Sequence, residues 1–91
     1  MKADTVVRRT DSLSSVDVNG ESVILNVDSG TYFGLDGVGA RIWSLLESPV
    51  TYGELVRVVV NEYEVDRDTA ESDIADLVRE LEQKGLVETG E

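Results

Sequence analysis

Pairs of acidic residues are the side chains in this sequence whose spacing first suggests chemistry, namely Asp66 with Asp68 and Asp73 with Asp76. A carboxylate dyad or a metal site requires such groups to converge in a cleft. These pairs instead recur around a predicted surface helix with few other ligands nearby. Asp66 and Asp68 have the spacing that opens a calcium loop, but the required glycine and terminal glutamate are absent from the expected positions. We therefore expect no metal and no cofactor.

The chain contains no histidine and no cysteine. Histidine is the commonest general base and a common zinc ligand, and cysteine supplies thiolates, so both routes to catalysis are closed. Carboxylates, hydroxyls, tyrosine and lysine remain, and no catalytic constellation of them is visible. Gly34, Gly37 and Gly39 do not have the spacing of a phosphate-binding loop, and no lysine follows them. We interpret these glycines as structural, and we expect the protein not to be an enzyme.

The segment Thr31–Leu35 (Thr-Tyr-Phe-Gly-Leu) is the strongest candidate for a binding element. It follows a turn signal at Ser29-Gly30 and precedes Asp36, so it is expected to be the last strand of a meander and to lie at a sheet edge. An edge presents unpaired N–H and C=O groups to which a second chain can add. We predict that this strand recruits a peptide. The alternative, that Tyr32 and Phe33 simply fill the core, stays open.

Alternating apolar residues predict two further strands before this segment. Asn19-Gly20 separates them and is a strong hairpin signal, because both residues tolerate positive φ. A two-residue loop there places Val16 opposite Val23. A second two-residue loop, at Ser29-Gly30, would place Tyr32 beside Val27. The predicted sheet therefore has three antiparallel strands.

Three helices are expected after the sheet, each with its own start and stop signals. These signals are Asp36 and Pro49 for the first helix, Thr51 with Glu54 for the second, and Asp66 with Gly85 for the third. The predicted fold is therefore α+β, with an N-terminal three-stranded antiparallel sheet followed by three helices, arranged like a winged helix-turn-helix. Residues 13–87 form one domain, residues 1–12 a flexible arm or a short extra strand, and residues 88–91 a frayed tail. The pair Arg8-Arg9 in the arm is expected to be solvated.

The charge of the chain argues against nucleic acid as a partner. The net charge is −11, and residues 47–91 contain thirteen acidic and four basic residues. In a DNA-binding winged helix the third helix would carry basic residues into the major groove, whereas the third helix here would repel phosphates. The longest apolar runs are a few residues, and no signal core follows Met1, so we expect a cytoplasmic protein without a membrane segment.

Four motifs along the chain together resemble a known family. They are Gly30-x-Tyr32-x-x-Leu35-Asp36, Gly39-x-x-Ile42-Trp43, Thr51-x-x-Glu54-Leu55 and Asp73-Ile74-x-x-Leu77-x-x-x-Leu81-x-x-x-Gly85-Leu86-Val87. In this order and spacing the chain resembles the PqqD-like peptide chaperones, the recognition elements for precursors of ribosomally made, modified peptides. Asp36 stands where the family more often has asparagine, and both residues cap helices.

The resemblance implies that a leader peptide binds as an added strand, between the third strand and the third helix. Carried onto this chain, the peptide-binding residues are Thr31, Tyr32, Phe33, Gly34 and Leu35 on the strand, and Ala70, Asp73, Ile74, Asp76, Leu77 and Glu80 on the helix. The free-standing acidic domain is similar to the N-terminal half of split lasso-peptide B proteins, which implies a leader peptidase and a cyclase as partners.

Two alternatives to a lasso-peptide role remain at this stage. Chaperones for quinone-cofactor precursors, which are modified by a radical enzyme, share the same motifs. A winged-helix transcription regulator is the competitor from another functional class, and the acidic third helix argues against it. The protein is expected to be a monomer, although the same strand edge could also form a strand-swapped dimer.

Overall fold

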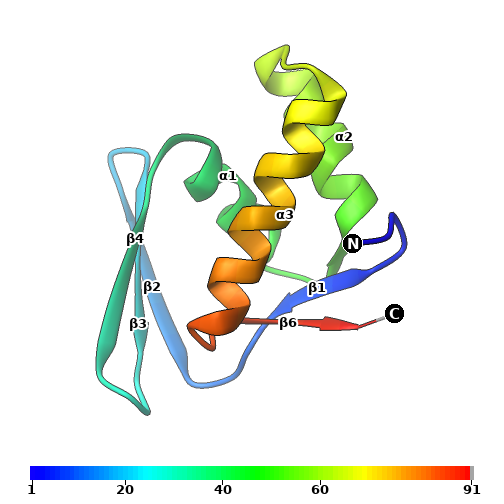
Figure 1. Cartoon of the computed structure of the whole chain (residues 1–91). Helices are drawn as coiled ribbons and strands as arrows, with labels where there is room; N and C mark the ends of the chain where they lie inside the picture. Colours follow the sequence, from blue (N-terminus) through cyan, green and yellow to red (C-terminus); the bar gives the residue numbers. More distant parts are fainter. Residues whose placement is uncertain (91) are drawn as a thin grey trace.

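Two small sheets and three helices make up the part of the chain that the structure describes, residues 1–90 of a computed structural model (Figure 1). The strands are β1 (Val6–Arg9), β2 (Leu13–Val18), β3 (Glu21–Asn26), β4 (Thr31–Leu35), β5 (Val50–Thr51) and β6 (Val87–Gly90). The helices are α1 (Gly37–Leu45), α2 (Tyr52–Tyr63) and α3 (Arg67–Gln83). The predicted α+β class is confirmed, with the three-stranded antiparallel sheet β2-β3-β4 preceding the helices.

A second sheet, β5-β1-β6, joins the two ends of the chain. Residues 1–12, for which an arm and a strand were both open, contain strand β1. The frayed tail expected at residues 88–91 is wrong for residues 88–90, because β6 runs antiparallel to β1 with Val6 opposite Gly90 and Arg9 opposite Val87. Val7 and Val87 are fully buried between the sheet and the helices, which anchors both strands. Glu91 lies outside the described residues.

The β2–β3 hairpin has the register that the sequence predicts. Asn19 and Gly20 both have positive φ, 53° and 81°, and Val16 lies opposite Val23. The predicted two-residue turn before β4 is wrong: Asn26 pairs with Thr31, so four residues form the loop and Tyr32 lies opposite Leu25 rather than Val27.

The Asn26 side chain explains this wider turn. Its Oδ1 accepts hydrogen bonds from the N–H groups of Asp28 and Ser29, at 3.1 and 3.3 Å, and its carbonyl accepts one from Gly30, at 2.8 Å. Gly30 takes the left-handed conformation that closes the loop. Because the register differs from the prediction by two residues, every side chain of β4 stays on its predicted face.

The helix starts agree with the predicted caps in two of three cases. Thr51 accepts a 3.2 Å hydrogen bond from the N–H of Glu54, and Asp66 caps α3 in the same way through Thr69. The Glu54 carboxylate binds Arg57 rather than returning to Thr51, so only half of the capping box forms. Asp36 occupies the N-cap position of α1 but makes no side-chain cap hydrogen bond.

The helix ends differ in how well the sequence predicts them. Helix α1 ends at Leu45, several residues before the stop signal at Pro49. Helix α3 ends in the predicted Schellman motif, in which Leu86 donates to the carbonyl of Leu81 at 2.9 Å and Gly85 to that of Glu82 at 3.0 Å. This ending turns the chain from α3 directly into β6.

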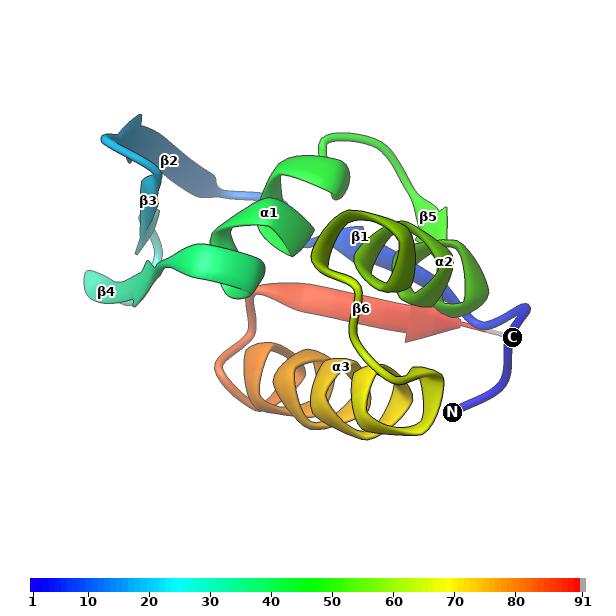
Figure 2. The same ribbon diagram turned by 90° about the horizontal axis from the view of Figure 1, so that it is seen from above.

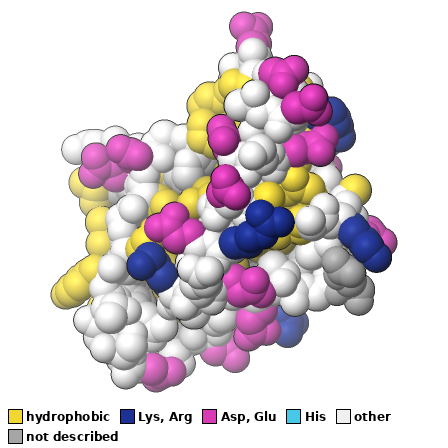
Figure 3. Space-filling model, in the orientation of Figure 1, with side chains coloured by type: hydrophobic (Ala, Val, Ile, Leu, Met, Phe, Trp, Pro, Cys, Tyr) yellow, Lys and Arg dark blue, Asp and Glu magenta, His cyan; other side chains and the backbone are white. Residues whose placement is uncertain are grey.

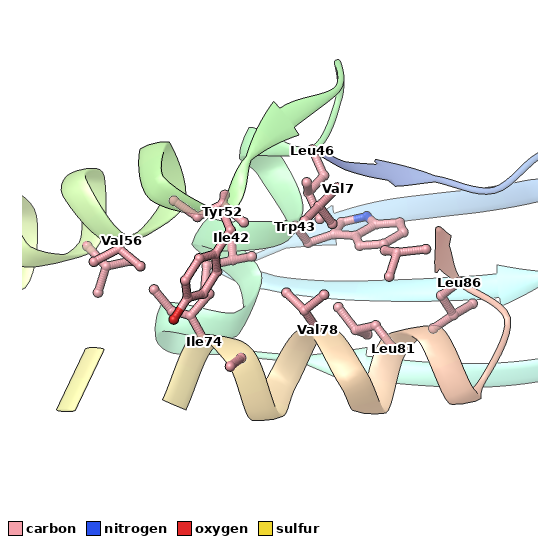
Figure 4. Packing of buried hydrophobic residues seen from close by; sticks show 14 of the residues in the cluster. Val7, Ile42, Trp43, Leu46, Tyr52, Val56, Ile74, Val78, Leu81 and Leu86 are labelled. Carbon is pink, nitrogen blue, oxygen red and sulfur yellow. The ribbon is translucent and has the colours of Figure 1, made fainter. Parts of the chain in front are cut away.

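The core lies between the three helices and the two sheets, with Trp43 of α1 among its largest buried side chains (Figure 4). The expectation that Arg8-Arg9 is solvated is wrong for Arg9. Its guanidinium lies 4.1 Å from the centre of the Trp43 ring and donates to the Trp43 carbonyl, which ties β1 to α1. Burial lowers the pKa of Arg9. Arg8 is exposed and pairs with Glu88 at 3.1 Å.

None of the helices within residues 1–90 has the length and apolar character needed to cross a membrane.

Candidate functional site

Strand β4 has one open edge. It pairs with β3 on one side, and within residues 1–90 no strand lies on the other. Figure 2 shows β4 at the edge of its sheet nearest to α3, with β2 at the far edge.

The register identifies which backbone groups face this opening. Val27 donates to the carbonyl of Ser12, which marks them as a hydrogen-bonded pair. Hydrogen-bonded and non-hydrogen-bonded pairs alternate along antiparallel strands, so the even-numbered residues of β3 bond to β4. Their partners are Thr31, Phe33 and Leu35. The N–H and C=O groups of Tyr32 and Gly34 consequently point outward from the edge.

Helix α3 lies along this edge, and an apolar pocket of about 350 Å³ opens between them. Its walls come from the end of β4, from α1 and from one face of α3. Helix α2 and the loop between α2 and α3 add one residue each. The lining residues are Gly34, Leu35, Asp36, Val38, Gly39, Ile42, Val59, Val65, Thr69, Ala70, Asp73, Ile74 and Leu77. We call this the upper pocket. Apolar walls with a few polar groups at the mouth are typical of a binding site.

A second hollow, of about 410 Å³, lies at the other end of β4. Its lining residues are Ser29, Thr31, Tyr32, Phe33, Lys84 and Leu86. We call this the lower pocket. The two pockets and the open edge together form a groove that follows β4, with the N-terminal half of α3 at the Leu35 end and its C-terminus at the Thr31 end.

The structure brings most of the sequence-predicted site residues to this groove. Gly34, Leu35, Ala70, Asp73, Ile74 and Leu77 line the upper pocket, and Thr31, Tyr32 and Phe33 line the lower one. Asp76 and Glu80 line neither. Asp76 is exposed and forms a 3.6 Å ion pair with Arg79. Whether these residues bind a peptide remains a prediction.

Several groove residues were not found from the sequence, and two had a usable signal. Gly39 lies against Leu35: a Cβ built on Gly39 would be 3.2 Å from a Leu35 methyl, so a side chain there would push into the pocket wall. Its place in the Gly39-x-x-Ile42-Trp43 motif reflects this close approach. Lys84 is the other residue with a signal, because its spacing from Leu77 places the two on the same side of α3.

Charge is distributed unevenly around the groove. Figure 3 shows acidic side chains over the face of α3 and hydrophobic side chains in the hollow between α3 and the sheet. Asp36 and Asp73 are exposed at the upper pocket, and neither forms an ion pair among the described residues. Within residues 1–90 no cluster of acidic side chains is arranged to hold a metal ion.

The family of the chain follows from comparison with known proteins. The model of the family described as "Coenzyme PQQ synthesis protein D (PqqD)" matches residues 21–87, which include β3, β4 and all three helices. This chain belongs to the PqqD family. Comparison with curated proteins gave no match.

Two solved structures of similar proteins each contain a leader peptide. TbiB1, solved in complex with the TbiA(beta) leader peptide, is 46% identical with a TM-score of 0.85, over 89% of this chain and 94% of that one. A lasso peptide synthetase B1 complexed with the leader peptide is 30% identical with a TM-score of 0.80, over 90% and 96% of the two chains.

A third similar structure supports the fold alone. It is the PqqD truncation of Methylobacterium extorquens PqqCD, described as a stand-alone recognition element for ribosomally synthesised, modified peptides. Its identity is 22% and its TM-score 0.71, over 91% of this chain and 88% of that chain.

Proposed function

We propose that this PqqD-family protein binds the leader segment of a ribosomally made precursor peptide in lasso-peptide biosynthesis. The leader adds as a strand to the open edge of β4, in the groove against α3. The observation that carries the proposal is the coincidence of an unpaired strand edge with an apolar pocket at its side. Main-chain hydrogen bonds supply affinity in this mode, and side-chain pockets supply selectivity.

The geometry supports a peptide rather than a small molecule as the ligand. Tyr32 and Gly34 offer two pairs of backbone donors and acceptors, spaced as in a strand. The upper pocket is large enough for one or two apolar side chains and is open along β4. Two solved relatives, 46% and 30% identical to this chain, were each solved in complex with a leader peptide.

In this proposal the protein presents the precursor and carries out no chemistry itself. A leader peptidase and an ATP-dependent cyclase would act on the bound precursor. The chain has neither histidine nor cysteine, and within residues 1–90 no three acidic residues are grouped so that they could hold a metal ion. Binding the leader while leaving the rest of the precursor free suits this division of labour.

The direct test is a binding titration with the leader encoded by the small reading frame beside the gene, and with the TbiA(beta) leader as a second probe. Fluorescence anisotropy should show saturable binding of at least one leader. A scrambled peptide of the same composition is the control. Equal binding of the scrambled peptide, or no saturation by either leader, would contradict the proposal.

The family description raises a second candidate, delivery of the precursor of the PQQ cofactor to a radical enzyme. The groove would serve that role in the same way. Titration with a PQQ precursor peptide separates the two: tighter binding of that peptide than of either lasso leader would favour the second candidate.

A further inference from the structure

The groove has opposite charges at its two ends. Asp73 of α3 and Asp36, the N-cap residue of α1, both line the upper pocket, and both are exposed. Lys84, the C-cap residue of α3, lines the lower pocket together with Thr31, eleven residues after Asp73. A strand in the groove would therefore meet carboxylates at one end and an ammonium group at the other.

Lys84 is held toward the groove by its contact with β4. Its Nζ lies 5.3 Å from the centre of the Phe33 ring, a cation–π distance. Among the described residues Lys84 forms no ion pair, whereas Arg8, Arg41, Arg57, Arg67 and Arg79 each pair with a carboxylate. Arg9 also forms no ion pair among the described residues, but it stacks on Trp43, whereas Lys84 lies over the groove.

The nearest competing carboxylate on the same side of α3 is Glu80. It lies one helical turn before Lys84, yet the two side chains form no ion pair, and Glu80 lines neither pocket. A position at the end of α3 also lets Lys84 stabilise the helix dipole. Any exposed cation in the last turn would do that, without contact to Phe33 and without lining a pocket.

We propose that Lys84 and Asp73 make the groove select leader peptides by charge polarity. The bound segment carries an acidic side chain where it passes Lys84 and a basic one where it passes Asp73. This inference rests on the proposed function and adds a rule for which leaders bind. Because the two poles lie at opposite ends of β4, the paired charges on the leader are about four to six residues apart. The same polarity fixes the direction of the leader, since the reversed peptide places like charges together.

The test uses the TbiA(beta) leader as probe, with Glu or Lys placed at each position in turn. The measured quantity is the ratio of the two Kd values at each position. For the wild-type protein we expect one position at which Glu binds about threefold to fivefold tighter than Lys, as for a partly exposed ion pair. A second position, several residues away, should show the opposite preference.

Two variants locate the poles. Lys84→Glu should reverse the preference at the first position and leave the second unchanged, and Asp73→Lys should do the converse. Arg79→Glu is the matched control for Lys84→Glu, because it makes the same change in net charge on another side of α3. It should change the Kd values of all the peptides by a similar factor and should not reverse the preference for Glu or Lys at any position. If Lys84 acted only on the helix dipole, Lys84→Glu would lower the stability of the protein. The preference for Glu or Lys at each leader position would not change.

The outcomes separate the two claims. If the wild-type protein binds the leader but Lys84→Glu and Asp73→Lys both keep the wild-type profile, charge polarity is wrong and leader binding stands. If the wild-type protein binds none of the peptides, both claims are overturned. Far-ultraviolet circular dichroism of each variant confirms that it is folded.

Discussion

The sheet β2-β3-β4 has two open edges, and only one of them has the features of a binding site. By the same alternation that exposes Tyr32 and Gly34 on β4, the backbone groups of Leu13, Ser15 and Asp17 face outward from β2. Both edges therefore offer unpaired donors and acceptors. They differ in what lies beside them: α3 and two pockets lie along β4, whereas β2 lies at the far side of the sheet (Figure 2).

If the proposed function holds, an unpaired edge alone is not sufficient for selective binding. Strand β2 is exposed over most of its length, and Ser15 and Asp17 give its edge a polar character that discourages strand addition. Strand β4 buries Phe33 and Leu35 partly toward the helices, so an added strand there would gain apolar contacts as well as hydrogen bonds. On the proposed function, the helix beside the edge, rather than the edge itself, would provide the selectivity.

Among the proposed changes, proline at an outward-facing position of β4 should have the largest effect on leader affinity, and the same change in β2 should have little. Gly34→Pro removes a donor that the added strand would use, and an unmet hydrogen bond in the complex costs about 1–3 kcal/mol. We expect leader affinity to fall about tenfold or more. Gly34 does not have positive φ, and β4 is an edge strand, where proline is tolerated.

The matched control is Ser15→Pro, which removes an outward-facing donor from β2. Its leader affinity, measured by calorimetry, should stay within twofold of wild type. If Ser15→Pro weakened binding as much as Gly34→Pro, the assignment of the leader to β4 would be wrong.

Truncation of the apolar wall should have the next largest effect. Leu77 is partly exposed on α3 and lines the upper pocket. Leu77→Ala removes contact area that a bound side chain would bury, and we expect about fivefold to tenfold weaker binding. Val16→Ala, on the exposed outer face of β2, makes a smaller apolar truncation away from the groove and should leave Kd unchanged. Equal losses in the two variants would argue against the upper pocket as a contact.

Charge reversal on α3 should have a smaller effect that depends on salt. For a leader with a basic residue at that end, Asp73→Lys should weaken binding about threefold to fivefold at low salt. The loss of affinity should be smaller at 0.5 M salt. Asp76→Lys changes the net charge equally but lies near Arg79, outside both pockets. It should have little effect on Kd. A larger effect of Asp76→Lys than of Asp73→Lys would mean that the groove extends around α3 to Asp76.

A change at the other sheet should affect stability but not binding. Thr51 lies in β5 and caps α2 by accepting from the N–H of Glu54. Thr51→Ala should lower the free energy of unfolding by about 1 kcal/mol. Leader affinity should be unchanged, because β5 pairs with β1 and has no place in the groove. Chemical denaturation measures the free energy of unfolding and fluorescence anisotropy measures leader affinity, both on the same protein sample. A loss of affinity would contradict the expectation, because it would mean that the sheet containing β5 affects the groove.

Local signals in the sequence predicted the elements that have strong turns and caps. Asn19-Gly20 set one hairpin, Asp66 began α3, and Gly85 ended it, because each fixes the backbone within a few residues. The β4 turn was mispredicted because the Asn26 side chain bonds to the loop, a contact that competes with the two-residue turn.

Contacts between distant parts of the chain could not be predicted in this way. Pairing of β6 with β1 depends on residues some eighty positions apart, and the short β1 segment has no hairpin signal. The stacking of Arg9 on Trp43 could not be predicted for the same reason, because the two residues lie 34 positions apart in the chain. In the groove, the family resemblance supplied Ala70, Ile74 and Leu77, and the motif around Gly39 carried a signal for that residue, whereas Val65 joins the groove only through tertiary packing.

The most direct test of the account is an NMR titration of isotope-labelled protein with a leader peptide, read separately at the two edges. We predict that amide shifts concentrate in β4 and along α3 from Ala70 to Lys84, with the amides of Tyr32 and Gly34 gaining protection from exchange. The amides of β2 should not change. Shifts and protection along β2, with β4 unaffected, would contradict the assignment of leader binding to the edge beside α3.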